Sequence, residues 1–439
     1  MRMKKIDMEL RNPRFTVIIP VLNRSSYLYH TLRTCSNQNY VNLEIIVSDD
    51  CSIDDTKRMV DSFSKLDPRI SYIRPSDTEN VGMLNNFEFA LNHVKEGYVI
   101  ALGGDDALMP DSISKMWEIL QETNREILCW PTDAYIYPCQ DIINGQLVLQ
   151  AKGFKLEEEY RIIDSNTFLA RQSEHLFYIS DVESPMIYVK GVISTKVVDR
   201  VKSRSKDGKF YTCSTPDGYS GIVVAGEVKD WVFYNKPLSI HGVSPSSQGF
   251  GYLTKSESAQ QHSESFFIKA KSIPMHPELA FQEYSPLITL MTADFLLTAR
   301  DIPGWPGTIV PIDYRKLIVN AVKELEDGLY PEAKLSRELE IIRNIAIKHD
   351  LLYYFEKVLE RSFRNGRSRL VGNAISPRLV YLDAKRFKVN NVFEASYFIK
   401  NTRNIYPIFG IKLIMSMLVN SFKYRLLSFK KKAKLSSYV

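Results

Sequence analysis

Short apolar runs alternate with amphipathic stretches along residues 15–130 of the chain. The apolar runs are FTVIIP (15–20), LEIIVS (43–48), ISYIR (70–74), YVIALG (98–103) and EILCW (126–130), and helix-like segments lie near 25–37, 54–65, 83–95 and 110–122. Runs that are apolar on both faces and alternate with helices are typical of a parallel sheet covered by helices. The pattern therefore predicts a doubly wound α/β sheet.

The pattern changes twice further along the chain. Residues 131–250 are irregular and rich in Tyr, Ser, Gly and Pro, with strand-like pieces at 186–194 and 231–244, and we interpret them as the second half of the same domain. From about residue 255, helical periodicity dominates. We expect an α/β domain over 1–254, a mostly helical domain over 255–404 and a distinct segment over 405–439.

The last segment, 405–439, combines apolar residues with a cluster of cations. Its apolar stretch is interrupted by Lys412 and is followed by Lys423, Arg425, Lys430, Lys431, Lys432 and Lys434. Such a segment suits a helix that lies on an anionic membrane surface. The alternative is a last helix packed on the core, followed by a solvated basic tail.

Composition limits the class of protein. The 439 residues are 44% hydrophobic and 25% charged, which is typical of a soluble globular protein, and a net charge of +6 does not indicate a protein that coats nucleic acid. Five cysteines without a C-x-x-C pair favour a reducing cytoplasm. The first 15 residues lack the apolar core of a secretory signal, and no run reaches the ~18 apolar residues of a membrane span.

Three of the predicted strands end in polar, turn-forming residues. These ends are Pro20 with Asn23 and Arg24, the run 48–52 (SDDCS), and the run 103–106 (GGDD). Ligands of an open parallel sheet bind beyond the carboxyl ends of its strands. The three polar ends are therefore expected to share one ligand-binding edge.

The carboxylates at this edge have chemical and structural interpretations. Asp105 and Asp106 could bind a hard divalent cation that grips a diphosphate, or could belong to an ordinary turn before a helix that Pro110 begins. Asp50 could accept a hydrogen bond from a pyrimidine base or from ribose hydroxyls. Alternatively, its neighbourhood serves to cap the next helix through Ser52 and Asp54.

Four segments in this order resemble the family-2 glycosyltransferases of the GT-A fold. They are TVIIPVLNRSSYL, EIIVSDDCSIDDT, NVGMLNNFEFAL and GYVIALGGDDALMP, and the resemblance is strong over about 14–122 and looser to about 250. It implies a GT-A domain, with a Rossmann-like, mostly parallel sheet flanked by helices, over 1–254. The nucleotide-binding half would span about 14–130 and the acceptor half about 131–254.

The resemblance also implies roles for individual residues. The residues that match nucleotide-binding positions of the family are Pro20, Leu22, Arg24, Asp50, Asn80, Gly82, Asn86 and Asp105. Asp106 matches the position that binds a divalent cation, Mn²⁺ or Mg²⁺. The first acidic position of the family's motif is Gly103 here, which leaves the metal with fewer protein ligands.

Two further residues match family positions beyond the acidic motif. Asp217, in STPDGYSG, stands where relatives carry the base that deprotonates the acceptor hydroxyl in an inverting transfer, with a surface turn as the alternative and Glu183 as a competing base. Proline before it and glycine after it predict a tight turn. His241, in LSIHGVSPSSQG, matches a position that completes the metal shell, although a lone histidine can equally be structural.

The function that the resemblance implies is transfer of a sugar from a UDP-, dTDP- or GDP-linked donor to a glycan acceptor. Inversion, a lipid-linked acceptor, a place in O-antigen or capsule synthesis and peripheral attachment at the inner face of the membrane are further expectations. A sugar nucleotidyltransferase is disfavoured, because PVLNRSSYL replaces the Gly-rich phosphate loop of that class after the first strand. A non-catalytic, transferase-like scaffold at the membrane stays open.

Overall fold

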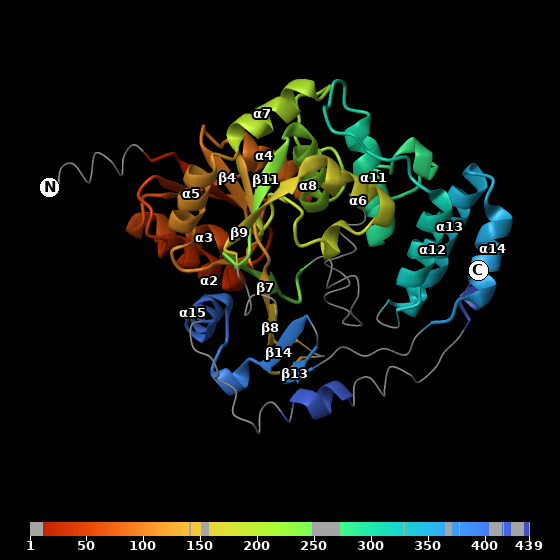
Figure 1. The fold of residues 1–439 in the computed structure, drawn as a ribbon. Coiled ribbons are helices and arrows are strands. Elements are labelled where there is room, and N and C mark those ends of the chain that lie inside the picture. The colour runs from red at the N-terminus through yellow and green to blue at the C-terminus, as the bar shows by residue number, and fades with distance from the viewer. Residues whose placement is uncertain are drawn as a thin grey trace.

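The computed structural model describes residues 12–139, 142–150, 158–247, 273–327, 330–364, 371–376, 378–403, 415, 417–422 and 434–438 (Figure 1). The helices are α2 (Ser25–Ser36), α3 (Thr56–Leu66), α4 (Met83–Asn92), α5 (Ser112–Thr123), α6 (Ser165–His175), α7 (Thr195–Arg204), α8 (Pro216–Glu227), α11 (Ile288–Arg300), α12 (Tyr314–Leu325), α13 (Leu335–Lys348), α14 (Leu352–Arg361) and α15 (Val392–Arg403). The strands are β1 (Phe15–Val21), β2 (Leu43–Asp49), β3 (Ile70–Ile73), β4 (Tyr98–Ala101), β5 (Ala107–Leu108), β6 (Ile127–Cys129), β7 (Asp133–Ile136), β8 (Gln146–Gln150), β9 (Tyr160–Asp164), β10 (Gly191–Ser194), β11 (Asp230–Tyr234), β12 (Ser239–Val243), β13 (Ala374–Ile375) and β14 (Leu379–Asp383).

The main sheet contains eight strands in the order β3-β2-β1-β4-β10-β6-β11-β9. Strands β1 to β4 are mutually parallel, which confirms the doubly wound start that the apolar runs predict. The sheet is mixed beyond β4, because β10 enters between β4 and β6 and runs antiparallel to both. The insertion of β10 separates β4 from β6, which correspond to consecutive apolar runs of the sequence.

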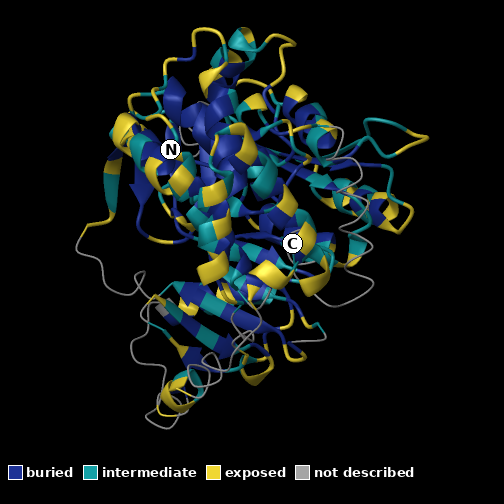
Figure 2. Cartoon of the chain, turned by 90° about the vertical axis from the view of Figure 1, so that its right-hand side faces the viewer, coloured by how far each residue is buried: buried dark blue, intermediate teal, exposed yellow. Residues whose placement is uncertain are grey.

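Helices cover each face of the main sheet. Figure 2 shows that the interior of this part is buried, whereas the helices around it carry both buried and exposed residues. Val17 and Ile19 of β1 pack in one core with residues of α2 and α5. Ile18 points the opposite way and packs with Phe87 and Leu91 of α4. The apolar runs are therefore continuous because both of their faces are buried.

A second sheet of six strands, in the order β13-β14-β8-β7-β12-β5, lies beside the main sheet. Strands β13 and β14 come from residues 374–383, within the region that was expected to be helical, and β14 pairs antiparallel with β8. The division of the chain at residue 255 stays a prediction. The second sheet nevertheless shows that late residues complete a layer begun by early ones.

The remaining helices continue the core of the α/β part. Helix α11 packs against α8 and α6, and α12 to α14 extend from it (Figure 1). Helix α15 returns to α2, where the Arg33 guanidinium lies 3.8 Å from the Phe393 ring centroid. None of the helices in the described part of the chain has the length and apolar character that a bilayer-spanning helix needs.

A buried carboxylic acid lies in the core between α11 and the segment before α8. Asp294 accepts a hydrogen bond from the backbone N–H of His276 at 2.6 Å, and burial raises its pKa from 3.8 to about 7, against the lowering effect of Cys213 and that N–H. The folded protein therefore holds the Asp294 proton at a pH where the unfolded chain has lost it.

We expect Asp294→Asn to stabilise the protein more at pH 8 than at pH 5. The pKa of Asp294 is higher in the folded state, so the stability of the wild-type protein falls as pH rises from about 4 to 7, whereas the neutral amide loses nothing. Melting temperatures of both proteins at the two pH values measure this difference. An equal shift at pH 5 and pH 8 would contradict it.

Candidate functional site

An acidic turn follows β4 and leads directly into β5. Strand β5 pairs antiparallel with β12 in a register that joins Ser239 to Leu108 and Ile240 to Ala107. If this register is continued by two more residue pairs, His241 lies beside Asp106 and Gly242 lies beside Asp105. Two motifs more than 130 residues apart in the sequence are thereby brought together at the edge of the sheet.

Asp105 is buried and has a partner for each carboxylate oxygen. Its Oδ1 accepts a hydrogen bond from Arg24 Nη1 at 2.9 Å, and its Oδ2 accepts from the hydroxyls of Ser244 (2.6 Å) and Ser247 (2.7 Å). Burial acts to raise the pKa of Asp105, but the Arg24 charge and the two hydroxyls lower it below its ordinary value. Asp105 is therefore an anion that fixes the 244–247 turn.

Asp106 and His241 form the second half of the acidic turn. Asp106 accepts hydrogen bonds from the backbone N–H groups of Gly103 (2.6 Å) and Gly242 (2.8 Å), and its Oδ1 lies 3.3 Å from His241 Nδ1. Burial alone would lower the pKa of His241, but Asp106, with the charges of Asp105 and Asp217, raises it. The surrounding carboxylates therefore favour the protonated form of His241.

Asp106 and His241 are the predicted ligands of a divalent cation. Within the described ranges, no group of three or more His, Cys, Asp or Glu residues is arranged to hold a metal ion. Asp106 and His241 together offer two ligands. Mg²⁺ commonly takes one or two carboxylates and completes its shell with water and substrate phosphates, so the pair fits an ion that arrives with a diphosphate.

Asp217 lies in the first turn of α8, rather than on the tight turn that its sequence predicts. Proline at the start of a helix fits, because its missing N–H would have no partner there. Burial raises the pKa of Asp217, against the lowering effects of the helix-start N–H groups and of the charges on His241 and Lys190. The charge of His241 therefore acts on Asp217 as well as on Asp106.

A second group of predicted residues surrounds the end of β2. The Asp50 carboxylate accepts hydrogen bonds from the backbone N–H groups of Val81 (2.7 Å) and Gly82 (3.0 Å), and Asn80 Nδ2 donates to the Asp50 carbonyl at 3.2 Å. Gly82, at φ 88°, has the left-handed conformation that glycine adopts readily. The carboxylate thus closes the loop that leads into α4.

Asn86 anchors α4 to β2. Its Oδ1 accepts from the Ser48 hydroxyl at 2.5 Å, and its Nδ2 donates to the Ser48 carbonyl at 3.0 Å, with the side chain fully buried. Both ends of the amide are therefore bonded within the protein. In this structure Asn86 positions the loop around Asp50 instead of presenting its amide to a ligand.

The end of β1 connects the two groups. The backbone N–H of Asp50 donates to the Val21 carbonyl at 2.8 Å, while Arg24, three residues after Val21, binds Asp105. Pro20 lies inside β1 and Leu22 directly follows it, both partly buried. The residues predicted from the first three motifs therefore lie along one edge of the sheet.

Glu183, the competing candidate for the base, forms ion pairs with two arginines. Its Oε2 lies 2.7 Å from Arg171 Nη2, and its Oε1 contacts the Arg161 guanidinium. Each of the two carboxylate oxygens of Glu183 is thus occupied by a guanidinium group. This geometry favours Asp217 over Glu183 as the base.

Sequence reasoning missed Tyr188 and Lys190, which lie between the acidic turn and α8. Lys190 is buried, its Nζ donates to the Asp181 carbonyl at 2.7 Å, and burial lowers its pKa against the raising effect of nearby carboxylates that include Asp217. Burial, with the charges of Asp106 and Asp105, raises the pKa of Tyr188. A lysine inside the apolar segment MIYVKGVIS is the one signal that could have drawn attention to this region.

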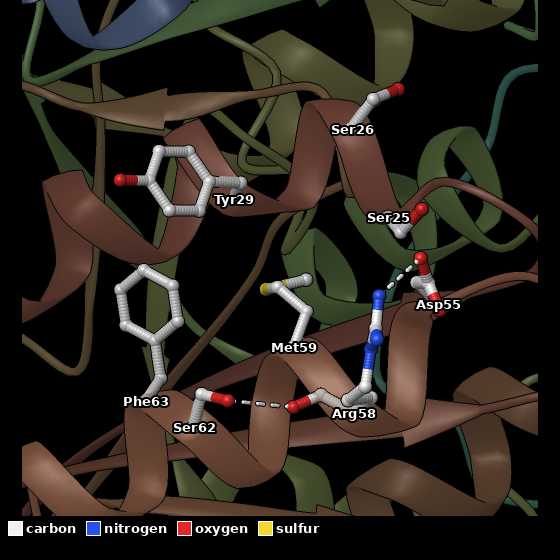
Figure 3. Close-up of a pocket in the computed structure, with 8 residues that line it drawn as sticks. All are labelled: Ser25, Ser26, Tyr29, Asp55, Arg58, Met59, Ser62 and Phe63. Atoms are coloured by element: carbon white, nitrogen blue, oxygen red, sulfur yellow. Dashed lines mark hydrogen bonds and ion pairs between the residues drawn. The ribbon is translucent and has the colours of Figure 1, made fainter.

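A hollow between α2 and α3 lies outside the predicted site. Figure 3 shows Tyr29 and Phe63, whose rings meet edge to face with their centroids 5.5 Å apart, and Arg58 paired with Asp55. None of the predicted site residues lines it. The hollow therefore plays no part in the constellation described above.

Comparisons with known proteins place part of the chain among known sequences. Residues 16–179 of the chain match the family described as glycosyl transferase family 2. The chain is 30% identical over 168 residues to the Campylobacter jejuni GalNAc(5)-diNAcBac-PP-undecaprenol beta-1,3-glucosyltransferase, a match that covers 38% of this chain and 51% of that protein.

Other relatives match a smaller part of the chain or only its fold. Escherichia coli chondroitin synthase is 30% identical over 103 residues, which are 24% of this chain and 15% of that protein. A crystal structure of S. aureus TarS 1–349 in complex with UDP-GlcNAc aligns over 79% of this chain and 92% of that chain, with 12% identity and a TM-score of 0.43. The curated matches thus span about half the length of such relatives or less.

The close approach of β12 to the acidic turn makes Gly242→Ala a test of the site. A Cβ at residue 242 would lie 1.6 Å from the Asp105 carbonyl oxygen, so we expect the turn to be displaced, with a large fall in melting temperature. Gly208→Ala is the control: it has positive φ but no neighbouring atom within 4 Å, and it should cost only about 1 kcal/mol. Equal effects in thermal unfolding would contradict this account of the turn.

Proposed function

We propose that the protein transfers a sugar from a nucleotide-sugar donor to a saccharide acceptor in the synthesis of a bacterial surface polysaccharide, such as O-antigen or capsule. The observation that carries this proposal is the convergence of Asp105, Asp106, His241 and Asp217 at one end of a family-2 domain. The nucleotide would lie along the edge between Asp50 and Asp105, with its diphosphate directed towards Asp106.

Inversion is the stereochemical outcome that we propose. The acceptor oxygen forms a bond to the anomeric carbon while the bond from that carbon to the diphosphate oxygen breaks, and the electron pair leaves with the diphosphate. Asp217 takes the proton of the acceptor hydroxyl. Its raised pKa makes it a stronger base than an exposed aspartate, and its place at a helix start supports the charged form before the reaction.

Asp106 and His241 would hold the divalent cation, Mn²⁺ or Mg²⁺. Such an ion, when bound, neutralises the charge that develops on the departing diphosphate. Arg24 has a separate role: it holds Asp105 at 2.9 Å and donates through Nη2 to the Ser246 carbonyl at 2.5 Å. Arg24 thus joins the first motif to the loop that follows β12.

Asp217→Asn is expected to reduce the rate of transfer about 10²- to 10⁴-fold, because the amide cannot accept the proton, while nucleotide binding is retained. UDP, dTDP or GDP release from a panel of sugar nucleotides with mixed glycan acceptors measures the rate, and calorimetry measures binding. Since burial raises the pKa of Asp217, the wild-type rate should fall on acidification at a pH above 4.

Two outcomes would contradict this proposal. Full activity of Asp217→Asn would remove the base from the mechanism. A wild-type protein that binds none of the three nucleotides and releases none from their sugars would favour the non-catalytic scaffold.

A lipid-linked acceptor is proposed because a helix beside the second sheet exposes apolar side chains. Residues 417–422 are helical and bury Met417, while the side chains of Leu418, Val419 and Phe422 are about half exposed or more. Ser421 joins this helix to Ile375 of β13 through a hydrogen bond of 2.8 Å. The cations that follow in the sequence would complement anionic lipids, placing the protein at the inner face of the membrane.

Replacing both Val419 and Phe422 by Asp should weaken vesicle binding by at least about tenfold, because each buried apolar side chain contributes roughly 1.5–3 kcal/mol. Sedimentation with vesicles of phosphatidylglycerol and phosphatidylcholine measures binding. Tyr353→Asp on α14 is the control, since Tyr353 is 73% exposed on another element. Unchanged vesicle binding of the double variant would contradict a membrane role for this helix and would favour packing on the core as its role.

A further inference from the structure

We propose that Tyr188 is a donor-site residue, whose hydroxyl donates a hydrogen bond to an oxygen of the leaving diphosphate in the space where the acidic motif lacks its first carboxylate. The inference rests on the proposed function and adds a binding residue to the same site. No motif and no comparison assigns a role to Tyr188. Its position, the strained backbone beside it and the chemistry of the phenol carry the argument.

The Tyr188 hydroxyl lies directly against the acidic turn. A Cβ built on Gly103 would lie 2.6 Å from that hydroxyl, 2.9 Å from Asp106 Oδ2 and 3.1 Å from Asp105 Oδ1. A side chain at residue 103 and the phenol therefore compete for the same space. The glycine at the first position of the motif is explained by the tyrosine that reaches in from residue 188.

The ring of Tyr188 is held from two sides, and its hydroxyl is available. It packs against Phe87 at 6.1 Å and His241 at 6.4 Å between ring centroids. Among the hydrogen bonds of the described residues, none involves the Tyr188 hydroxyl, although two carboxylates lie close by. A positioned donor without a protein partner suits an oxygen that arrives with the substrate.

A strained backbone aims this ring. Val189 has φ 60°, a conformation that β-branched residues rarely adopt. It is held by its N–H, which donates to the Ala101 carbonyl at 2.8 Å, and by its carbonyl, which accepts from the Ser239 hydroxyl at 2.5 Å. Strain that the surroundings maintain is found mostly at functional sites.

The same segment is joined to the candidate base. The backbone N–H of Ile187 donates to the Ser220 hydroxyl at 3.1 Å, and that hydroxyl donates to the Asp217 carbonyl at 2.6 Å. Tyr188 and Asp217 thus share one hydrogen-bonded frame. A phenol there would contact the leaving group while Asp217 faces the acceptor.

The phenol differs chemically from the carboxylate that it replaces. A carboxylate adds negative charge and needs a cation before a diphosphate can approach, whereas a phenol with an ordinary pKa near 10 is neutral at pH 7 and donates a proton directly to a phosphate oxygen. The exchange makes the site less negative by one charge. The diphosphate then depends less on the metal for neutralisation.

The test is Tyr188→Phe, which removes one oxygen atom and keeps the ring. We expect kcat/KM for sugar-nucleotide turnover to fall about 10- to 100-fold, as for the loss of a hydrogen bond to a charged group. Calorimetry should show weaker binding of the nucleoside diphosphate, chosen from UDP, dTDP and GDP as the tightest ligand of the wild type. Binding of the corresponding monophosphate should stay unchanged, because the hydrogen bond is to the diphosphate.

Tyr135→Phe is the matched control, since Tyr135 lies buried in the second sheet and its hydroxyl has no described partner. Equal loss of monophosphate and diphosphate affinity in Tyr188→Phe would assign the residue a structural role and overturn the inference. Wild-type turnover by Tyr188→Phe would overturn it as well. A wild-type protein that neither binds nor turns over any of the nucleotides would overturn the proposed function first, and the inference with it.

Discussion

The antiparallel pairing of β12 with β5 is the contact on which the site depends. Gly242 approaches the Asp105 carbonyl so closely that no other residue fits without movement, and its N–H binds Asp106. This pairing sets His241 against Asp106 and brings Ser244 and Ser247 to Asp105. Without it, the acidic turn would carry two adjacent negative charges with few partners, a costly arrangement in a buried position.

Charge balance explains why the carboxylates can be buried together. Arg24 and two hydroxyls stabilise the Asp105 anion, whereas the partners of Asp106 among the described residues are two backbone N–H groups and His241. Asp105 is therefore suited to hold the protein's own loops, and Asp106 retains the capacity to interact with a cation. The resemblance assigns Asp105 to the nucleotide and Asp106 to the metal, and in the structure Asp105 also binds Arg24 and the hydroxyls of Ser244 and Ser247.

The sequence predicts what is local and misses what depends on distant pairing. The strands from residue 15 to 103 and helices α2 to α5 follow from apolar runs and amphipathic spacing, because both faces of those strands are buried. The insertion of β10 and the return of β14 depend on contacts between segments far apart in the chain. Val189 looks like an ordinary strand residue, so its positive φ, and with it the direction of Tyr188, could not be predicted.

The second sheet connects the acidic turn with the exposed apolar helix at residues 417–422. Strand order β13-β14-β8-β7-β12-β5 runs without a break from Ile375, which Ser421 contacts, to the acidic turn beside β5. A surface that docks on the membrane through this helix would therefore hold the acidic turn at a fixed position relative to the bilayer. Hydrogen-bonded strands, rather than a linker, make this connection, so under the proposed lipid-linked acceptor the width of the sheet would set how far the site lies from the membrane. The pairing of β14 with β8 is thus what joins residues 374–383 to the sheet that carries β12 and β5.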